Sequence, residues 1–170
     1  MSARVTASID LPGVGAPEAF AALVDPAAQE RWMIATRLYP VQAAAPVPLV
    51  GSRVAAFTGV GGLGFLDTMT VTAYEPPHRW VVDKDGDLLR GIGTMEIRPI
   101  PGGCRARWTN ELTLPFGVCG RAAFVLVRPV VELALRACLR RLARLLQTGA
   151  LPADHRRPDE HRRPGTGAPR

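Results

Sequence analysis

The sequence of 170 residues contains a single lysine, Lys84, although lysine and arginine together number 21. The formal net charge of +6 therefore comes from arginine, which is spread over a helical segment and the end of the chain. This spread, in a chain rich in Ala, Gly and Pro, fits a GC-rich coding sequence better than a basic patch, which needs charge gathered on one face. We expect no specific nucleic-acid partner.

Histidine is also scarce, and its positions exclude two kinds of active site. His78 follows Pro76-Pro77 in a predicted turn, while His155 and His161 lie near the end of the chain. None is therefore expected to face a carboxylate and a serine, as a hydrolase triad requires. No cluster of His, Cys, Asp or Glu has the spacing of a metal site either. We expect neither a metal nor a cofactor.

The three cysteines, Cys104, Cys119 and Cys138, are an odd number at spacings that match no zinc or redox motif. Reduced structural thiols in a cytoplasmic protein are the favoured interpretation. Residues 1–13 lack the apolar core of a signal peptide. We expect a cytoplasmic protein without an integral membrane segment; the sequence leaves its oligomeric state open.

The longest apolar-rich stretch, residues 116–147, predicts one long amphipathic helix. Arg128, Glu132 and Arg136 interrupt it, so it is not a membrane span. Pro129 predicts either a kink or the start of a second helix. The middle of the apolar face is small, which predicts close approach to another element or an open space. This face consists of Val127, Val131, Ala134, Cys138, Leu142 and Leu145.

Upstream of this helix, the hydrophobic pattern alternates with the period of two that is typical of strands. Two short helices interrupt it after the first strand, and the second of them begins at Pro26 with Asp25 as its N-cap. The Gly-rich residues 59–65 predict a hairpin rather than a nucleotide loop, because a strand pattern follows them. Residues 84–87 predict another hairpin turn. The predicted strands are residues 4–11, 34–41, 53–58, 65–74, 78–83, 88–98 and 104–114.

An antiparallel sheet with one apolar face must cover that face, and the long helix is the element able to do so. The sequence therefore predicts an α+β domain, residues 1–148, in which the sheet curls around the C-terminal helix. Residues 149–170 are polar, rich in Pro and Arg, and contain HRRP twice. They predict a disordered basic tail.

Three segments, EPPHRWVV at residues 75–82, residues 91–112, and LRRLARLL at residues 139–146, resemble the START-like (SRPBCC) helix-grip superfamily. Its members include START domains, bacterial polyketide cyclase/dehydrase-like proteins and birch-pollen-allergen-type proteins. The resemblance covers about residues 3–147 and concerns strands, turns and the gripping helix. It implies a hydrophobic cavity between sheet and helix that binds or transports a lipid, a sterol or a polyketide-like molecule.

The strand alternation predicts which side chains would face this cavity. The candidates are Met69, Val71, Trp80, Met95, Trp108, Asn110, Val127, Val131, Ala134 and Cys138. Asp67 and Asn110 are the polar candidates: a buried carboxylate acts as a general acid or base, and an amide stabilises an enolate. A cyclase or dehydratase is therefore the alternative to a binding protein, although a solvent-exposed Asp67 at the end of its hairpin is favoured. A second alternative is binding to an anionic surface through the arginine face and the tail.

Overall fold

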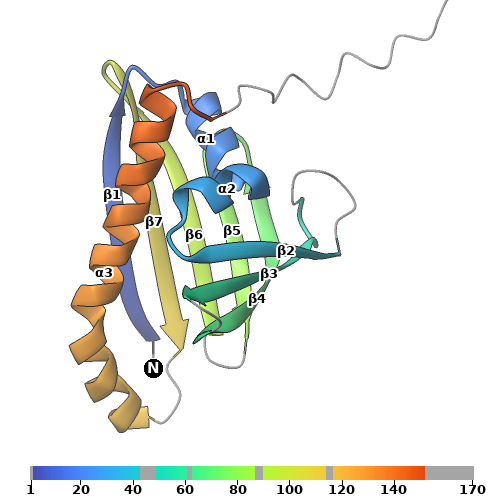
Figure 1. Cartoon of the computed structure of the whole chain (residues 1–170), viewed down its shortest axis with the longest axis vertical. Helices are drawn as coiled ribbons and strands as arrows, with labels where there is room; N and C mark the ends of the chain where they lie inside the picture. The colour runs from blue at the N-terminus through green and yellow to red at the C-terminus, as the bar shows by residue number, and fades with distance from the viewer. Residues whose placement is uncertain (1, 43–48, 61–62, 87–89, 114–116, 152–170) are drawn as a thin grey trace, which may run out of the picture.

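The computed structural model describes residues 2–42, 49–60, 63–86, 90–113 and 117–151. It has a seven-stranded antiparallel sheet with the order β1-β7-β6-β5-β4-β3-β2, and a long C-terminal helix (Figure 1). The elements are β1 (Ser2–Pro12), α1 (Ala16–Val24), α2 (Pro26–Trp32), β2 (Thr36–Gln42), β3 (Arg53–Val60), β4 (Leu63–Glu75), β5 (Arg79–Asp85), β6 (Arg90–Ile100), β7 (Gly103–Thr113) and α3 (Gly117–Gln147). This is the α+β arrangement that the sequence predicts.

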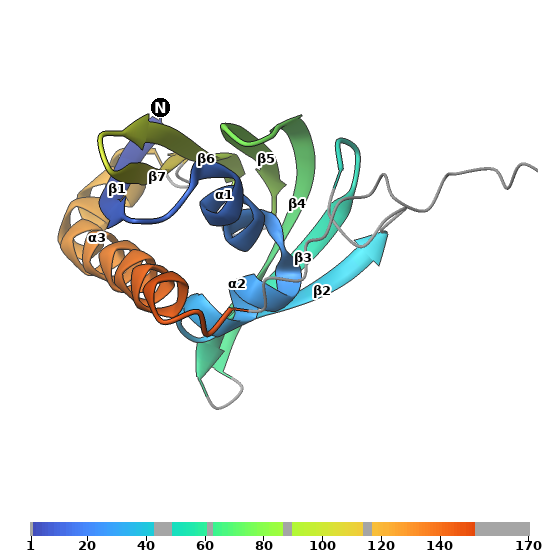
Figure 2. The ribbon, with the colours of Figure 1, turned by 90° about the horizontal axis from the view of Figure 1, so that it is seen from above.

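The first and last strands in the sequence, β1 and β7, are neighbours in the sheet, and their pairing sets the shape of the domain. β1 pairs with β7 along its whole length, from Ser2 opposite Thr113 to Pro12 opposite Gly103. Seen from above, the sheet curls from β1, beside α3, round to β2, beside α2 (Figure 2). The long helix and the two short helices therefore lie on the concave side of the sheet.

The two short helices are separated where Pro26 interrupts the helical hydrogen-bond ladder. The Asp25 carboxylate accepts hydrogen bonds from the backbone N–H groups of Ala27 at 3.3 Å and Ala28 at 3.0 Å. This is the N-cap that the sequence predicts, and it satisfies donors that the first turn leaves unpaired.

Trp32, at the end of α2, anchors the helix pair to the sheet. Its side chain is fully buried, and its indole N–H donates to the carbonyl of Ala22 at 2.9 Å. Its ring meets that of Trp108 on β7 edge-on, with the centroids 5.8 Å apart. Edge-on packing is a favourable arrangement for aromatic rings, so this contact holds α2 in place above the sheet.

A bulge in β4 changes which side chains face inward. The register with β5 shifts between Val71 and Ala73, so that Tyr74 lies directly opposite Trp80. Opposite residues share a face, and the Tyr74 ring accordingly packs 5.7 Å from the ring of Phe20 in α1. Strict alternation from Met69 and Val71 would place Tyr74 on the outer face, but the extra residue of the bulge reverses the pleat.

Both predicted hairpin turns lie at strand ends, but the strands extend further than predicted. β3 and β4 form the Gly-rich hairpin, with Val60 opposite Leu63. β5 continues to Asp85, so the prediction that Lys84 belongs to a turn is wrong. Lys84 is a strand residue, paired with Met69 on β4 and with Gly91 on β6.

The long helix runs without a break from Gly117 to Gln147 and has Pro129 inside it, so no second helix begins there. After Gln147, the N–H of Gly149 donates to the carbonyl of Leu146 at 3.1 Å. Gly149 has a φ of +63°, which is typical of a glycine that ends a helix. Residues 152–170 lie outside the described residues, and the disordered tail stays a prediction.

The two halves of α3 are buried to very different extents. Among the described side chains of α3, residues 124–147, the buried ones all belong to the C-terminal half: Leu135, Cys138, Leu139, Leu142, Ala143 and Leu146. In the N-terminal half, Val125, Leu126, Val130 and Leu133 are 59–80% exposed. The described chain contains no helix that is both long enough and apolar enough to cross a membrane.

The predicted apolar face of α3 is thus only partly its buried face. Cys138 and Leu142 are buried, but Val127 and Ala134 are exposed. The reason is that this part of α3 borders a cavity, so that only Phe124 and Val131 of its described apolar side chains pack partly against the core.

Candidate ligand-binding cavity

A cavity of about 460 Å³ lies between the concave face of the sheet, α2 and α3. Its wall takes residues from β2 through β7 and from both helices, and most of them are apolar. Small-molecule sites usually have volumes of about 300–1,000 Å³ and a few polar groups in an apolar wall. The cavity therefore has the size and the lining of a small-molecule site.

Nine of the ten side chains that the sequence predicts for the cavity lie on its wall: Met69, Trp80, Met95, Trp108, Asn110, Val127, Val131, Ala134 and Cys138. Val71 does not, because it is 1% exposed within the solid core. Beyond Met69, the interior is filled by Val71 itself and by the Phe20–Tyr74 pair. The bulge that turns Tyr74 inward thus helps to close this end.

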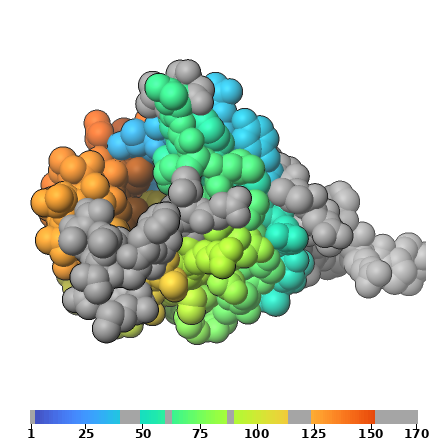
Figure 3. Space-filling model, turned by 90° about the horizontal axis from the view of Figure 1, so that it is seen from below, coloured from blue at the N-terminus to red at the C-terminus, as the bar shows by residue number. Residues whose placement is uncertain are grey.

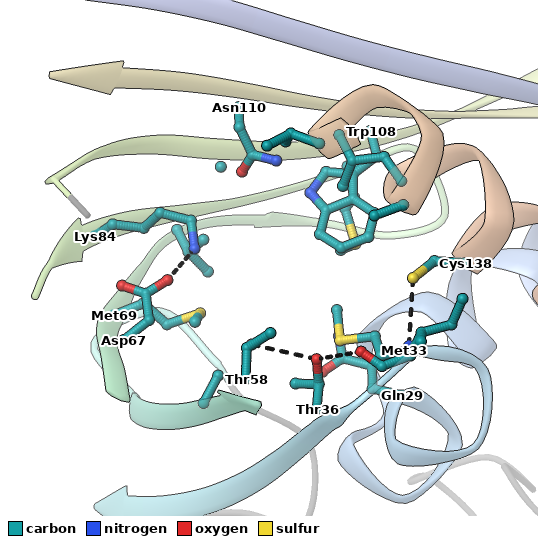
Figure 4. A pocket seen from close by; sticks show the side chains of 18 of the residues that line it. Gln29, Met33, Thr36, Thr58, Asp67, Met69, Lys84, Trp108, Asn110 and Cys138 are labelled. Atoms are coloured by element: carbon teal, nitrogen blue, oxygen red, sulfur yellow. Dashed lines mark hydrogen bonds and ion pairs between the residues drawn. The ribbon is translucent and has the colours of Figure 1, made fainter. Parts of the chain in front are cut away.

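Asp67, on β4, is buried in the cavity wall rather than exposed to water. Its side chain is 4% exposed, and its Oδ2 accepts a hydrogen bond from the Lys84 Nζ, which also makes this contact an ion pair (Figure 4). The Lys84 side chain is 12% exposed. The favoured prediction of a solvent-exposed Asp67 is wrong, because β4 begins at Leu63 and carries Asp67 inside the sheet.

Asn110, on β7, lies on the same side of the cavity as this ion pair (Figure 4). Between them is Gly93, on β6, which has no side chain to separate the two groups. A Cβ at Gly93 would lie 3.4 Å from both the Asn110 Oδ1 and the Lys84 Cε. Asp67, Lys84 and Asn110 together form what we call the polar end of the cavity.

The polar end has hydrogen-bonding capacity that the described protein atoms do not use. The Asp67 Oδ1 and the Asn110 Oδ1 are buried and have no partner within the described chain. Buried polar atoms are rarely left unpaired, because an unmade hydrogen bond costs roughly 1–3 kcal/mol. The two atoms therefore mark a place where a bound molecule gains hydrogen bonds.

Polar groups on the opposite wall are satisfied by the protein itself. The Gln29 amide N–H donates to the carbonyl of Leu23. The hydroxyl groups of Thr36 and Thr58 hydrogen-bond each other at 3.3 Å (Figure 4). The unpaired buried acceptors of the described wall thus belong to the polar end, and Trp80 adds an unpaired buried indole N–H.

Cys138 contributes a sulfur atom to the wall from α3. Its Sγ accepts a hydrogen bond from the backbone N–H of Ile34 at 3.4 Å, which ties the segment between α2 and β2 to the long helix. Burial raises the pKa of the Cys138 thiol, and the Ile34 N–H only partly offsets this effect. The thiol is therefore protonated and weakly nucleophilic at neutral pH.

The cavity reaches the surface along the N-terminal half of α3. Among its wall residues, Val127 is 50% exposed, Val130 is 67% exposed, and Ile34 is 43% exposed. Seen from below, this half of α3 (orange) and the β3–β4 hairpin (green) occupy different sides of the lower end of the molecule (Figure 3). The mouth of the cavity is thus lined by apolar side chains.

Sequence reasoning missed Lys84 and the side chains that α2 contributes to the cavity wall. A signal for Lys84 was present, since it continues the inward alternation of Trp80 and Val82. The Asp-Gly pair that follows it is a strong turn signal and obscured that alternation. For α2 no such signal exists, because its place above the cavity depends on tertiary packing.

A curved antiparallel sheet that holds a long C-terminal helix, with two short helices after the first strand, defines a helix-grip protein. Solved structures share this fold. They include the di-domain ARO/CYC StfQ from the steffimycin biosynthetic pathway, with a TM-score of 0.69 and 16% identity, covering 88% of this chain and 52% of that one. TTHA0849 from Thermus thermophilus has a TM-score of 0.69 and 15% identity, covering 87% of this chain and 99% of that one.

The model of the family described as "Polyketide cyclase / dehydrase and lipid transport" matches residues 2–147. The chain belongs to this family. Uncharacterised proteins of Mycobacterium bovis and Mycobacterium tuberculosis are 32% identical to it over 131 residues, which is 74% of each chain. The family description names both cyclase and transport members, so the choice between these functions depends on the cavity.

Proposed function

We propose that the protein binds or carries a small hydrophobic molecule, such as a lipid, a sterol or a polyketide-like compound, in the cavity between the sheet and α3. The observation that carries this proposal is the cavity of about 460 Å³ with its apolar wall and mouth. A well-packed interior leaves few spaces larger than a water molecule, so a space of this size supports the binding of a small molecule. The family supports the same function.

Native mass spectrometry of the purified chain, followed by solvent extraction, tests whether a hydrophobic molecule is retained. Titration with the neutral fluorescent probe N-phenyl-1-naphthylamine tests the cavity directly. Ala134→Phe places a ring inside the wall and should weaken binding by at least about tenfold, or about 1.4 kcal/mol. Leu133→Phe is the matched control, because Leu133 is 59% exposed and lies outside the cavity wall.

Equal affinity of the two variants, or no binding of the probe by the native chain, would contradict the proposal. Far-UV circular dichroism of both variants separates loss of the cavity from loss of the fold. Since both substitutions add the same phenyl ring to neighbouring positions of one helix, their effects on the helix itself are comparable.

A second candidate is a cyclase or dehydratase, and the polar end of the cavity favours it. Asp67 has the position of a general base, and Lys84 and Asn110 have the positions of groups that polarise a carbonyl. The probe is 4-hydroxy-4-phenylbutan-2-one, whose dehydration to 4-phenylbut-3-en-2-one is followed by absorbance. For an enzyme, Asp67→Asn should lower turnover by about a hundredfold or more while affinity changes little.

No acceleration of this dehydration by the native chain would count against catalysis and leave the binding proposal intact. Asn110→Ala serves as the second variant, because it removes the amide without changing the charge of the cavity. If the protein is a carrier, both variants retain affinity for N-phenyl-1-naphthylamine.

Binding to an anionic surface through the arginine face of α3 stays a prediction with less support. Arg128 contacts Glu132 at 2.9 Å, and Arg136 contacts the same carboxylate at 3.4 Å, so part of this positive charge is neutralised. The basic tail lies outside the described residues. Cys104 and Cys138 are unpaired thiols, which fits our placement of the protein in a reducing cytoplasm.

A further inference from the structure

The charge of the polar end limits the kind of group that it can hold. Asp67 and Lys84 form an ion pair, so their formal charges cancel inside an otherwise apolar cavity. A ligand carboxylate would lose its hydration there and would meet the Asp67 carboxylate as well as the Lys84 ammonium. The pair therefore favours a neutral polar group over an ionised one.

The unpaired hydrogen-bonding atoms of the polar end further limit which neutral group of a ligand can bind there. The Asp67 Oδ1 and the Asn110 Oδ1 are both acceptors without a partner, and they call for a donor on the ligand. The Lys84 ammonium has three N–H donors, one of which is directed at the Asp67 Oδ2, and the others call for an acceptor. A hydroxyl group is the smallest neutral group that both donates and accepts.

The neighbouring strands bring these polar side chains to one corner of the cavity wall. Gly93 lies between Lys84 and Asn110 and has no side chain, and a Cβ there would lie 2.9 Å from the Val82 Cγ2 and 3.4 Å from each of the two polar side chains. Most of the remaining wall is apolar and includes the rings of Trp80 and Trp108. The cavity thus combines one small polar corner with a large apolar body.

We propose that the polar end binds a neutral hydroxyl group of the ligand, as an alcohol, a phenol or an enol. This hydroxyl donates to the Asp67 Oδ1 or the Asn110 Oδ1 and accepts from the Lys84 Nζ, while the apolar part of the ligand extends toward α3. This inference rests on the proposed binding function and adds the chemistry and the orientation of the ligand.

Isothermal titration calorimetry with four compounds of one ring system tests the proposal at pH 7. 2-Naphthol donates and accepts, 2-methoxynaphthalene only accepts, naphthalene does neither, and 2-naphthoate carries a charge. We expect 2-naphthol to bind at least about tenfold tighter than each of the others, because hydrogen bonds to charged groups are the stronger ones.

The single lysine of the chain provides a second, independent readout. In protein labelled with [13C]lysine, one 13Cε signal reports on Lys84. 2-Naphthol should shift this signal, whereas naphthalene at the same saturation should shift it much less. This measurement requires no substitution, so it decides the question even if a variant fails to fold.

The double variant Lys84→Met/Asp67→Leu removes the ion pair without leaving a charge behind, and it should lose the preference for 2-naphthol while keeping its affinity for naphthalene. Arg53→Met/Asp85→Leu is the matched control, because that ion pair, at 2.9 Å, joins exposed side chains outside the cavity. The control should keep the preference unchanged.

Each possible result bears on a different part of the argument. Equal affinities for 2-naphthol and naphthalene would overturn the hydroxyl inference and leave the binding proposal standing. If 2-naphthoate binds most tightly, the inference that the group is neutral is wrong. If 2-methoxynaphthalene binds as tightly as 2-naphthol, the inference that the ligand donates a hydrogen bond is wrong. If none of the four compounds binds, the binding proposal itself fails.

Discussion

Lys84 on β5 and Asp67 on β4 form an ion pair on the concave face of the sheet, in the wall of a mostly apolar cavity. Hydrophobic side chains would fill these two positions at less cost in desolvation. The pair carries polar chemistry into a cavity of about 460 Å³, which is large enough for a small molecule. Its effects on stability and on binding can be measured separately.

Lys84→Met should lower the free energy of unfolding by about 3 kcal/mol, because it leaves the buried Asp67 carboxylate without its partner. Lys84→Met/Asp67→Leu should lie within about 1 kcal/mol of the native chain, since no charge is left behind. Urea denaturation followed by circular dichroism gives both values. Equal destabilisation of the single and double variants would show that the ion pair is not the cause.

Gly91→Ala should destabilise the fold by more than about 2 kcal/mol. Gly91 has a φ of +137°, and a Cβ there would lie 1.9 Å from the carbonyl oxygen of Glu111 on β7. Gly102→Ala is the control, because Gly102 has a φ of +75° but no atom within 4 Å of its Cβ position. It should cost only the backbone strain, about 1 kcal/mol. Thermal unfolding compares the two variants, and the reverse order would contradict the expectation.

Leu142→Ala and Leu133→Ala test the difference between the two halves of α3. Leu142 is fully buried, so its truncation should cost about 2–5 kcal/mol of unfolding free energy. Leu133 is 59% exposed, and its truncation should change stability by less than about 0.5 kcal/mol. Chemical denaturation measures both. Similar losses would mean that the N-terminal half is packed more tightly than its exposure indicates.

In a Cys119→Ser background, Cys104 and Cys138 should react slowly with a disulfide reagent in the folded protein at pH 8. Burial raises the pKa of both thiols, so the reactive thiolate fraction is smaller than in the unfolded chain and grows as the pH rises. Cys138 should react first, because it borders the cavity and Cys104 does not. Stopped-flow absorbance with Cys138→Ser as control assigns the phases, and complete reaction within the mixing time would contradict this prediction.

Much of the fold was predictable because its determinants are local in sequence. Alternation with a period of two placed Trp80, Met95 and Trp108 on the inner face, and their burial depends on little else. The capping chemistry of Asp25 and the fixed φ of Pro26 located the start of α2 to the residue. The prediction of a cavity came from the resemblance to helix-grip proteins, because the hydrophobic periodicity alone does not show whether the interior is open.

The remaining features depend on pairing between strands and could not be inferred from alternation. The bulge between Val71 and Ala73 belongs to the register of two strands, and it reversed the assignment of Tyr74. The burial of Asp67 depends on how far β4 and β5 extend past their expected ends. The unpaired hydrogen-bonding atoms of the polar end come together only when the four strands β4, β5, β6 and β7 are placed side by side.

Because α3 is unequally buried, different residues of this helix stabilise the fold and line the cavity. Its C-terminal half supplies the fully buried side chains, while residues 124–134 contribute five side chains to the cavity wall. Substitutions in this segment therefore alter the size of the cavity at small cost to the fold. Related chains can acquire new occupants by changing about three turns of one helix, without redesigning the sheet that holds it.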